Sequence, residues 1–219
     1  EDPEGAAAVG GGGGALSSVR LLIATKNRGK VVEIRALLGL ALQKNVEVVT
    51  LPDMPPVPEP RENGKTFAEN ARIKALHYAQ AHRVLCVADD SGLSVDALGG
   101  MPGVRSARFA GAGATDGQNN AHLLRELASF PRPWKGAFVC AAAAALPGRV
   151  IAESAGTVPG EILPAGRGSE GFGYDPLFLV ATLGKTMAEL TTDEKNRISH
   201  RGQAMRALVA EMKAAGILG

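Results

Sequence analysis

Two adjacent carboxylates, Asp89 and Asp90, follow the apolar run Val84 to Ala88 and precede Ser91. The run predicts a strand buried on both faces, with the carboxylates at its carboxyl end, where α/β sheets build ligand sites. Because successive strand residues point to opposite faces, one carboxylate can reach into a cleft while the other braces the loop. A few carboxylates together with phosphate oxygens are the ligands that Mg²⁺ prefers. The alternative is an Asx-turn, which explains only one of the two carboxylates.

A second candidate is a polar segment between a predicted strand and a predicted helix, made of Thr25, Lys26, Asn27, Arg28, Gly29 and Lys30. Gly29 permits a tight turn, and Lys30 opens the helix, whose free amide groups and dipole favour an anion. The first glycine of a Walker loop and the Ser or Thr that follows its Gly-Lys pair are both missing. The segment is therefore either a phosphate loop of another kind or a polar turn with an exposed lysine.

A third candidate is the Gly-rich loop that contains Phe172, Gly173, Tyr174 and Asp175. Aromatic residues make up only 4% of the chain, so two of them in one loop are notable. Phe172 and Tyr174 could offer a face on which a base stacks, a contact worth about 1–3 kcal/mol in single-strand binding. Alternatively, Phe172 fills the core beneath a turn.

The fourth candidate runs from Lys195 to Arg201 and gathers three fixed cations and His200 around a helix start predicted at Ser199. Cations are unfavourable at a helix N-terminus unless an anion or a ligand acceptor compensates them. This mismatch favours a functional role for His200 and Arg201.

These segments must be positioned by a sheet and its helices. Apolar runs predict strands over 20–25, 46–51, 84–88, 137–146, 149–155 and 177–180, the last of them the final strand. Helical spacing and N-cap residues predict helices over 31–38, 66–80, 115–127 and 199–212. No internal repeat and no Pro/Gly linker divides the body. We therefore expect one α/β domain with a central mixed sheet flanked by helices.

The composition excludes several classes of protein. The 219 residues carry a net charge of +2, which argues against a nucleic-acid surface and a polybasic membrane anchor. The longest apolar run, 137–146, is half of the roughly 20 residues that span a membrane. Residues 1–18 are acidic and Gly-rich and predict a flexible tail, so the domain should cover 19–219. Cys86 and Cys140 stand alone in apolar segments and predict buried, reduced core residues of a cytoplasmic protein.

Five motifs occur in an order that is specific to one family: IATKNRGK, ENGKTFAENARIKA, ADDSGLSVDALGGMPGVRSARFAG, GFGYDPLF and EKNRISHRGQA. Together they resemble the inosine triphosphate pyrophosphatase family, whose members hydrolyse deaminated purine nucleoside triphosphates. The resemblance runs from about Val19 to the C-terminus. It implies an elongated α/β fold with two lobes around an active-site cleft, and a homodimer.

The resemblance also implies roles for particular residues. Asp90 would be the catalytic carboxylate and an Mg²⁺ ligand, with Glu62 as a second ligand and Ser91 touching the substrate. The segment from Thr25 to Lys30 would hold the triphosphate, although Lys26 stands where many relatives have glycine. The nucleoside and base would be gripped by Phe172, Gly173, Tyr174, Asp175, Lys195, His200 and Arg201.

The residues and the resemblance converge on an Mg²⁺-dependent attack of water on the α-phosphorus, which releases pyrophosphate and a nucleoside monophosphate. Lys30 would help to neutralise the leaving group, and Asp90 would position or deprotonate the water. Lys195, His200 or Arg201 would donate to the 6-oxo group of hypoxanthine or xanthine, which adenine lacks. Two alternatives remain, a phosphotransferase that makes a nucleoside diphosphate and a nucleotide-binding module without catalysis.

Overall fold

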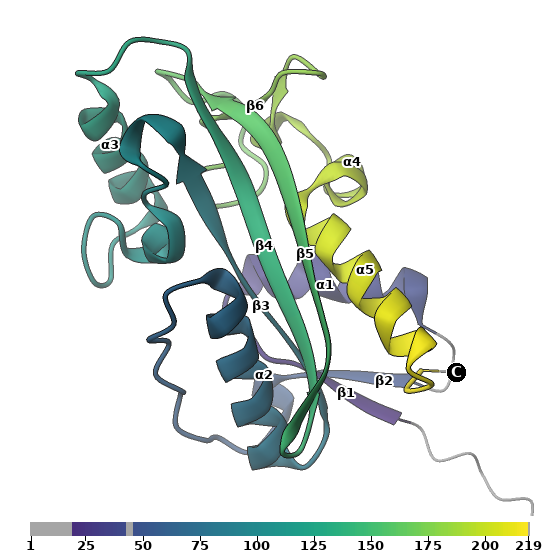
Figure 1. Cartoon of the computed structure of the whole chain (residues 1–219). Helices are drawn as coiled ribbons and strands as arrows, with labels where there is room; N and C mark the ends of the chain where they lie inside the picture. The colour runs from purple at the N-terminus through teal and green to yellow at the C-terminus, as the bar shows by residue number, and fades with distance from the viewer. Residues whose placement is uncertain (1–18, 43–45, 219) are drawn as a thin grey trace, which may run out of the picture.

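The computed structural model describes residues 19–42 and 46–218, so the tail predicted at 1–18 lies outside the described residues. The described strands form one mixed sheet in the order β2-β1-β3-β4-β5-β6-β7 (Figure 1). Their bounds are β1 (Val19–Ile23), β2 (Val46–Thr50), β3 (Leu85–Val95), β4 (Trp134–Leu146), β5 (Arg149–Ile162), β6 (Phe178–Val180) and β7 (Lys185–Thr186). The sheet and its flanking helices confirm the predicted α/β fold.

The helices are α1 (Arg28–Ala41), α2 (Phe67–His82), α3 (Asp116–Leu127), α4 (Thr192–Ile198) and α5 (His200–Ala214). Four short 3₁₀ turns lie between them, η1 (Leu51–Asp53), η2 (Asp96–Leu98), η3 (Gly103–Arg108) and η4 (Met187–Glu189). The side chains of Thr66, Thr115 and Ser199 accept hydrogen bonds from backbone N–H groups at the starts of α2, α3 and α5. These N-caps confirm three helix starts that the sequence predicts.

Three long strands tie two lobes into one body. β1 pairs in parallel with β2 and with the start of β3, whereas β3, β4 and β5 pair antiparallel. Figure 1 shows β3, β4 and β5 running between a lower lobe, with α1, α2, β1 and β2, and an upper lobe, with α3 and β6. The chain adds one strand beyond the predicted last one, because β7 forms a hairpin with β6. Two residues are too short to show a strand period.

Each lobe has its own core. In the lower lobe, one apolar cluster packs α1 and α5 on one face of the sheet, and an alanine-rich cluster packs α2 on the other. The upper lobe is built around larger side chains, including Phe138 and Phe178, whose ring centroids lie 4.3 Å apart. Cys140 and Cys86 are buried and free, on opposite faces of the sheet, as the sequence predicts. No described helix is long and apolar enough to cross a membrane.

Helix α5 packs directly on β5 at Gly156. A Cβ atom at this glycine would lie 2.1 Å from the carbonyl oxygen of His200 and 2.8 Å from the amide nitrogen of Ala204. The Gln203 side chain accepts a hydrogen bond from the backbone N–H of Thr157 on the same strand. The missing side chain thus sets how closely the first turn of α5, which carries His200, approaches the sheet.

Replacing Gly156 with alanine should therefore destabilise the fold, because the added methyl group meets backbone that must move. We expect the free energy of unfolding, measured by urea denaturation, to fall by about 1–3 kcal/mol. Gly39 provides the matched control, because it lies inside α1 with nothing within 4 Å of an added Cβ. Gly39→Ala should stabilise by roughly 0.5–1 kcal/mol. Equal effects of the two substitutions would contradict this account.

Candidate active site

A cavity of about 300 Å³ lies between the two lobes and gathers side chains from all four predicted segments. Its lining includes Thr25, Lys26, Asn27, Lys30, Glu62, Asp90, Ser91, Phe172, Gly173, Tyr174, Asp175, Lys195, His200 and Arg201. Two predicted residues lie outside it. Arg28 lines a neighbouring cavity of about 680 Å³ that shares Thr25 and Lys26, and Gly29 lies beneath the ring of Phe172.

The acidic pair does not follow the end of a strand, and this prediction was wrong. β3 continues through Asp89 and Asp90 to Val95, because β4 pairs with it along this whole length. The parallel partner β1 pairs only as far as Val87, so the carboxylates lie just beyond the end of that pairing. The predicted alternation is confirmed. Asp89 faces α1 and α5, while Asp90 faces α2.

Asp89 is fully buried and bound by two cations. Its Oδ2 atom lies 3.0 Å from Lys30 Nζ and 3.2 Å from Arg201 Nε. Burial alone would raise the pKa of Asp89, but Lys30 and Arg201 hold it well below its ordinary value. Asp89 is therefore an anion that anchors cations rather than a group that exchanges protons at neutral pH.

Asp90 has the opposite character. Its oxygens accept hydrogen bonds from Asn70 Nδ2 at 3.1 Å and from Lys74 Nζ at 3.3 Å. Burial raises the pKa of Asp90 above its ordinary value, although Lys74 and Lys30 oppose the shift. This carboxylate lines the cavity and accepts a proton more readily than an ordinary aspartate.

Asn70 and Lys74 were not among the residues that the sequence singled out. They lie four residues apart on α2 and therefore on one face of that helix. Asn70 is 1% exposed, and Ala71 and Ala75 beside this pair are buried against the sheet. Polar residues on the apolar face of a predicted helix were the signal that could have identified both.

Glu62 and Asp90 converge on the ammonium group of Lys74, which lies 2.9 Å from a Glu62 oxygen. Among the described residues, no three acidic, histidine or cysteine side chains are grouped to hold a metal ion. Two carboxylates around a single cation nevertheless fit Mg²⁺, which binds through one or two carboxylates plus substrate phosphates. The donor set is thus compatible with the predicted ion.

A buried carboxylate on α1, Glu33, joins the segments further. Glu33 is 4% exposed, pairs with Arg201 Nη1, and lies 2.7 Å from Lys195 Nζ. Lys195 also donates to Asp175 at 2.5 Å, and Arg201 donates to Ser91 at 2.7 Å. The sequence predicts that an anion or a ligand acceptor compensates the cations near this helix start. In the structure, the carboxylates of Glu33 and Asp175 compensate them.

The helix start that the sequence predicts at Ser199 is confirmed, but the sequence does not predict the short helix α4 that precedes it. Lys195 belongs to α4, and Ser199 ends α4 and caps the start of α5. Only His200 and Arg201 open α5.

Known proteins resemble the chain over most of its length. The Ham1 family matches residues 21–211. A relative from Geobacillus kaustophilus, called dITP/XTP pyrophosphatase, is 51% identical over 86% of this chain and 91% of its own. A protein of the same name from Geobacter sulfurreducens is 48% identical over 90% of this chain and 98% of its own. This chain belongs to the Ham1 family.

Solved structures of Ham1 proteins have the same fold. The Ham1 protein of Staphylococcus aureus superposes with a TM-score of 0.78 at 37% identity, covering 89% of this chain and 98% of that one. The HAM1 protein of Coxiella burnetii superposes with a TM-score of 0.80 at 36% identity, over 90% of this chain and 99% of that one. The family resemblance read from the five motifs is thereby confirmed.

Aromatic rings of the Ham1-family cavity contact the basic side chains of α4 and α5. His200 stacks on Phe138 with ring centroids 4.8 Å apart. Lys195 Nζ and Arg201 Cζ lie 4.8 Å and 5.6 Å from the centre of the Phe172 ring. Burial, together with Arg201 and Lys195, lowers the pKa of His200 far below its ordinary value, so the imidazole is neutral at pH 7.

The opposite pKa shifts of the acidic pair predict opposite effects on stability in this Ham1-family protein. Asp89→Asn removes the anion that Lys30 and buried Arg201 share and leaves Arg201 with Glu33 alone, and we expect a loss of about 3–5 kcal/mol in urea unfolding at pH 7. Asp90→Asn removes a carboxylate whose ionisation is unfavourable in the folded state, and should raise stability.

The pH dependence has a defined sign. Because the folded-state pKa of Asp89 is lowered, its contribution is complete above its ordinary pKa and declines as the pH falls below it. The stability gap between wild type and Asp89→Asn should therefore narrow only under acidic conditions. An equal loss of stability in both variants at pH 7 would contradict the two assignments.

Proposed function

We propose that the chain hydrolyses deaminated purine nucleoside triphosphates (ITP, dITP and XTP) to nucleoside monophosphate and pyrophosphate. This activity would remove them from the nucleotide pool before they enter DNA or RNA. The observation that carries the proposal is the position of Asp90, a carboxylate whose pKa is raised by burial. It lines the cavity between the N-terminus of α1, which favours an anion, and the aromatic ring of Phe172. Relatives called dITP/XTP pyrophosphatase, at 46–51% identity, support the same substrate class.

The triphosphate would lie against the start of α1. Asn27 caps this helix by accepting from the backbone N–H of Lys30, and the helix N-terminus favours an anion. Lys30 reaches the cavity beside Asp89, and Thr25 lines the same wall. Lys26 is on the rim, where it pairs with Glu59 at 2.5 Å and could exchange this partner for a phosphate.

Asp90 would take a proton from the water that attacks the α-phosphorus. A bond forms between the water oxygen and that phosphorus, the bond to the bridging oxygen breaks, and pyrophosphate leaves with the electron pair. Asn70 and Lys74 hold the Asp90 carboxylate in place during this step. Glu62 and Asp90 would hold Mg²⁺, which neutralises phosphate charge and lowers the pKa of water when bound.

The base would lie at the aromatic end of the cavity, against Phe172. Lys195 and Arg201 are bound by Glu33, Asp175 and Asp89, so their hydrogens are largely committed. His200 differs, because its buried Nδ1 atom has no partner among the described residues. A neutral imidazole can donate to the 6-oxo group of hypoxanthine or xanthine, whereas the amino group of adenine offers no acceptor there.

The product formed from ITP tests the proposal. We expect IMP and pyrophosphate in the presence of Mg²⁺ and neither after chelation with EDTA. Inosine diphosphate would indicate a phosphotransferase, and no product a binding module, and either result would refute the hydrolysis. Asp90→Asn should lower kcat by about 10²–10⁴ while ITP still binds. The matched control is Asp96→Asn, at an exposed position after β3, which should retain full activity.

Base selection gives a separate prediction. His200→Ala should narrow the ratio of kcat/KM for ITP over ATP, since it removes the proposed donor to the 6-oxo group. A site that hydrogen-bonds a substrate group discriminates by factors of about 10⁴ or more, so we expect a loss of at least tenfold in the ratio. His122→Ala is the control, since this histidine of α3 is partly exposed and does not line the cavity. An unchanged ratio in His200→Ala would move base recognition to other residues.

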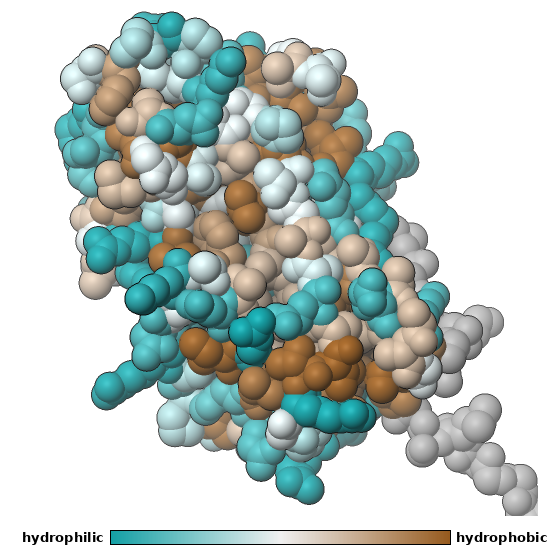
Figure 2. Space-filling view, in the orientation of Figure 1, coloured by the Kyte–Doolittle hydropathy of each residue, from teal (hydrophilic) through white to brown (hydrophobic). Residues whose placement is uncertain are grey.

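A homodimer and a cytoplasmic location are also proposed. Hydrophobic residues gather across the lower lobe on the face shown in Figure 2, over the region of α2 and the β4–β5 hairpin. Contiguous exposed apolar surface is typical of protein interfaces. This patch supports the proposed dimer, which sedimentation at equilibrium can test.

A further inference from the structure

The loop 171–175, called here the base loop, is held from outside by helix α3. The backbone N–H of Gly173 donates to Asp116 Oδ2 at 2.7 Å, and its carbonyl oxygen accepts from Asn120 Nδ2 at 3.0 Å. Asp116 and Asn120 are four residues apart and therefore lie on one face of α3. One helix thus fixes both backbone polar groups of one loop residue.

Helix α3 is a firm support for these two side chains. Thr115 and Gln118 form a reciprocal capping box at its start, and Leu123 and Leu127 are fully buried in the core of the upper lobe. The side chain of Asn119 also accepts from the backbone N–H of Ala110, which ties the preceding segment to the same turn. The first turn of α3 is therefore fixed independently of the base loop.

The base loop has no comparable support at Gly173 itself. Tyr174 donates from its hydroxyl to the carbonyl of Ser106 at 2.8 Å, and Asp175 is held by Lys195. Gly173 has a φ of +63° and nothing within 4 Å of the position of a Cβ. Within the loop, Asp175 closes a turn, since its Oδ2 accepts from the backbone N–H of Phe172 at 2.9 Å and its own backbone N–H donates to the Phe172 carbonyl at 3.2 Å. To this turn α3 adds the two hydrogen bonds to Gly173, which hold the N–H on one side of that residue and the carbonyl on the other.

We propose that Asp116 and Asn120 are positioning residues for base recognition, which hold the Gly173 peptides so that Phe172 presents its ring to the purine. The inference rests on the proposed function of the cavity. It assigns no contact between Asn120 and the substrate. Asp116 lines the cavity, and its Oδ2 atom is already engaged by the base loop. Its role is therefore exerted through Phe172.

The effect should appear in KM rather than in kcat. Asp116→Ala and Asn120→Ala should each raise KM for ITP about tenfold and leave kcat within about twofold, since the phosphate end and Asp90 are untouched. The dissociation constant of IMP, measured by calorimetry, should rise by a similar factor, while that of inorganic pyrophosphate should not change. Asp116→Asn retains an oxygen acceptor and should restore most of the affinity.

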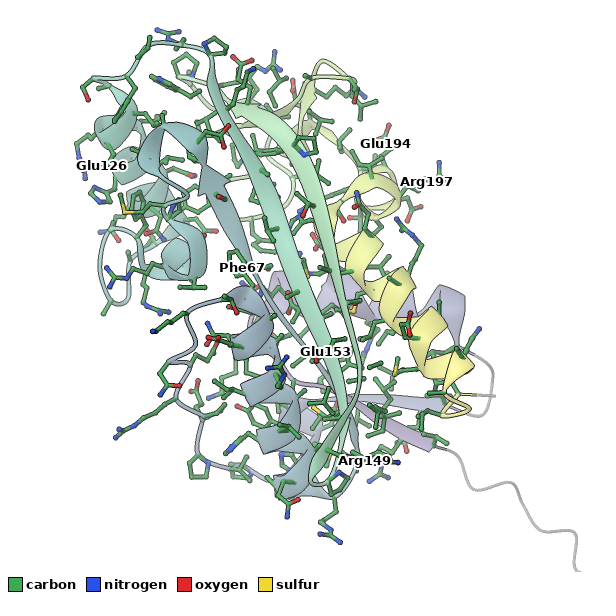
Figure 3. All side chains as sticks on the ribbon, in the orientation of Figure 1. Phe67, Glu126, Arg149, Glu153, Glu194 and Arg197 are labelled. Carbon is green, nitrogen blue, oxygen red and sulfur yellow. The ribbon has the colours of Figure 1, made fainter. Side chains whose placement is uncertain are left out.

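Glu126→Ala is the matched control on the same helix. Glu126 lies on the outer side of α3, remote from the sheet, and its side chain is 46% exposed (Figure 3). This variant should keep the wild-type KM and kcat. Unchanged KM in both Asp116→Ala and Asn120→Ala, or an equal loss of pyrophosphate affinity, would overturn the positioning role.

Hydrogen exchange separates this inference from the proposed function. Exchange of the Gly173 amide, followed by mass spectrometry in the free protein, should accelerate in Asp116→Ala and not in Glu126→Ala. If the wild-type protein releases no pyrophosphate from ITP, the proposed function is refuted, independently of any contact between α3 and the base loop. The exchange measurement still decides whether α3 holds the base loop, and an unchanged rate would refute that contact.

Discussion

The structure depends on a chain of buried charges that begins and ends on helix α1. Lys30 pairs with Asp89 on β3, Asp89 pairs with Arg201 on α5, and Arg201 returns to Glu33, one turn after Lys30. Removing one partner of such a buried pair typically costs about 3–5 kcal/mol, because a charge is left without compensation. Moving any one of the three elements relative to the other two would therefore break two of these three ion pairs.

This chain of charges explains how neighbouring carboxylates acquire different chemistry. Asp89 is committed to Lys30 and Arg201, so its charge is fixed. Asp90 points to the other face of the same strand, where burial dominates over Lys74 and raises its pKa. Two neighbouring residues thus act as a structural anion and a proton acceptor, because successive side chains of a β-strand point to opposite faces of the sheet.

The sequence predicts local features well and long-range partners poorly. The caps Thr66, Thr115 and Ser199 act within three residues, so a single sequence contains all the information about them. The polar run from Asp89 to Gly92 favours a turn locally, yet it stays in β3 because it pairs with the small side chains of β4.

The sequence does not identify Glu33 as a site residue, because its partner is also distant along the chain. It lies on the buried side of an apolar helix, and its partner Arg201 is 168 residues away. Lys74 lies 16 residues from Asp90 and looks like an ordinary helix lysine until α2 is packed on the sheet. The site segments could be named from the sequence, but the residues that brace them are defined only by tertiary contacts.

The balance of charge in the cavity bears on how a triphosphate is held. Its lining carries six cationic side chains, including Lys74 and Arg108, and five carboxylates, including Glu59 and Asp116. Lys30, Lys195 and Arg201 are further neutralised by Asp89 and Glu33 behind the wall. The protein alone therefore offers little net positive charge to a polyanion. This balance supports the proposed Mg²⁺ at Glu62 and Asp90. A divalent cation would supply positive charge, whereas the cationic side chains are already neutralised by carboxylates.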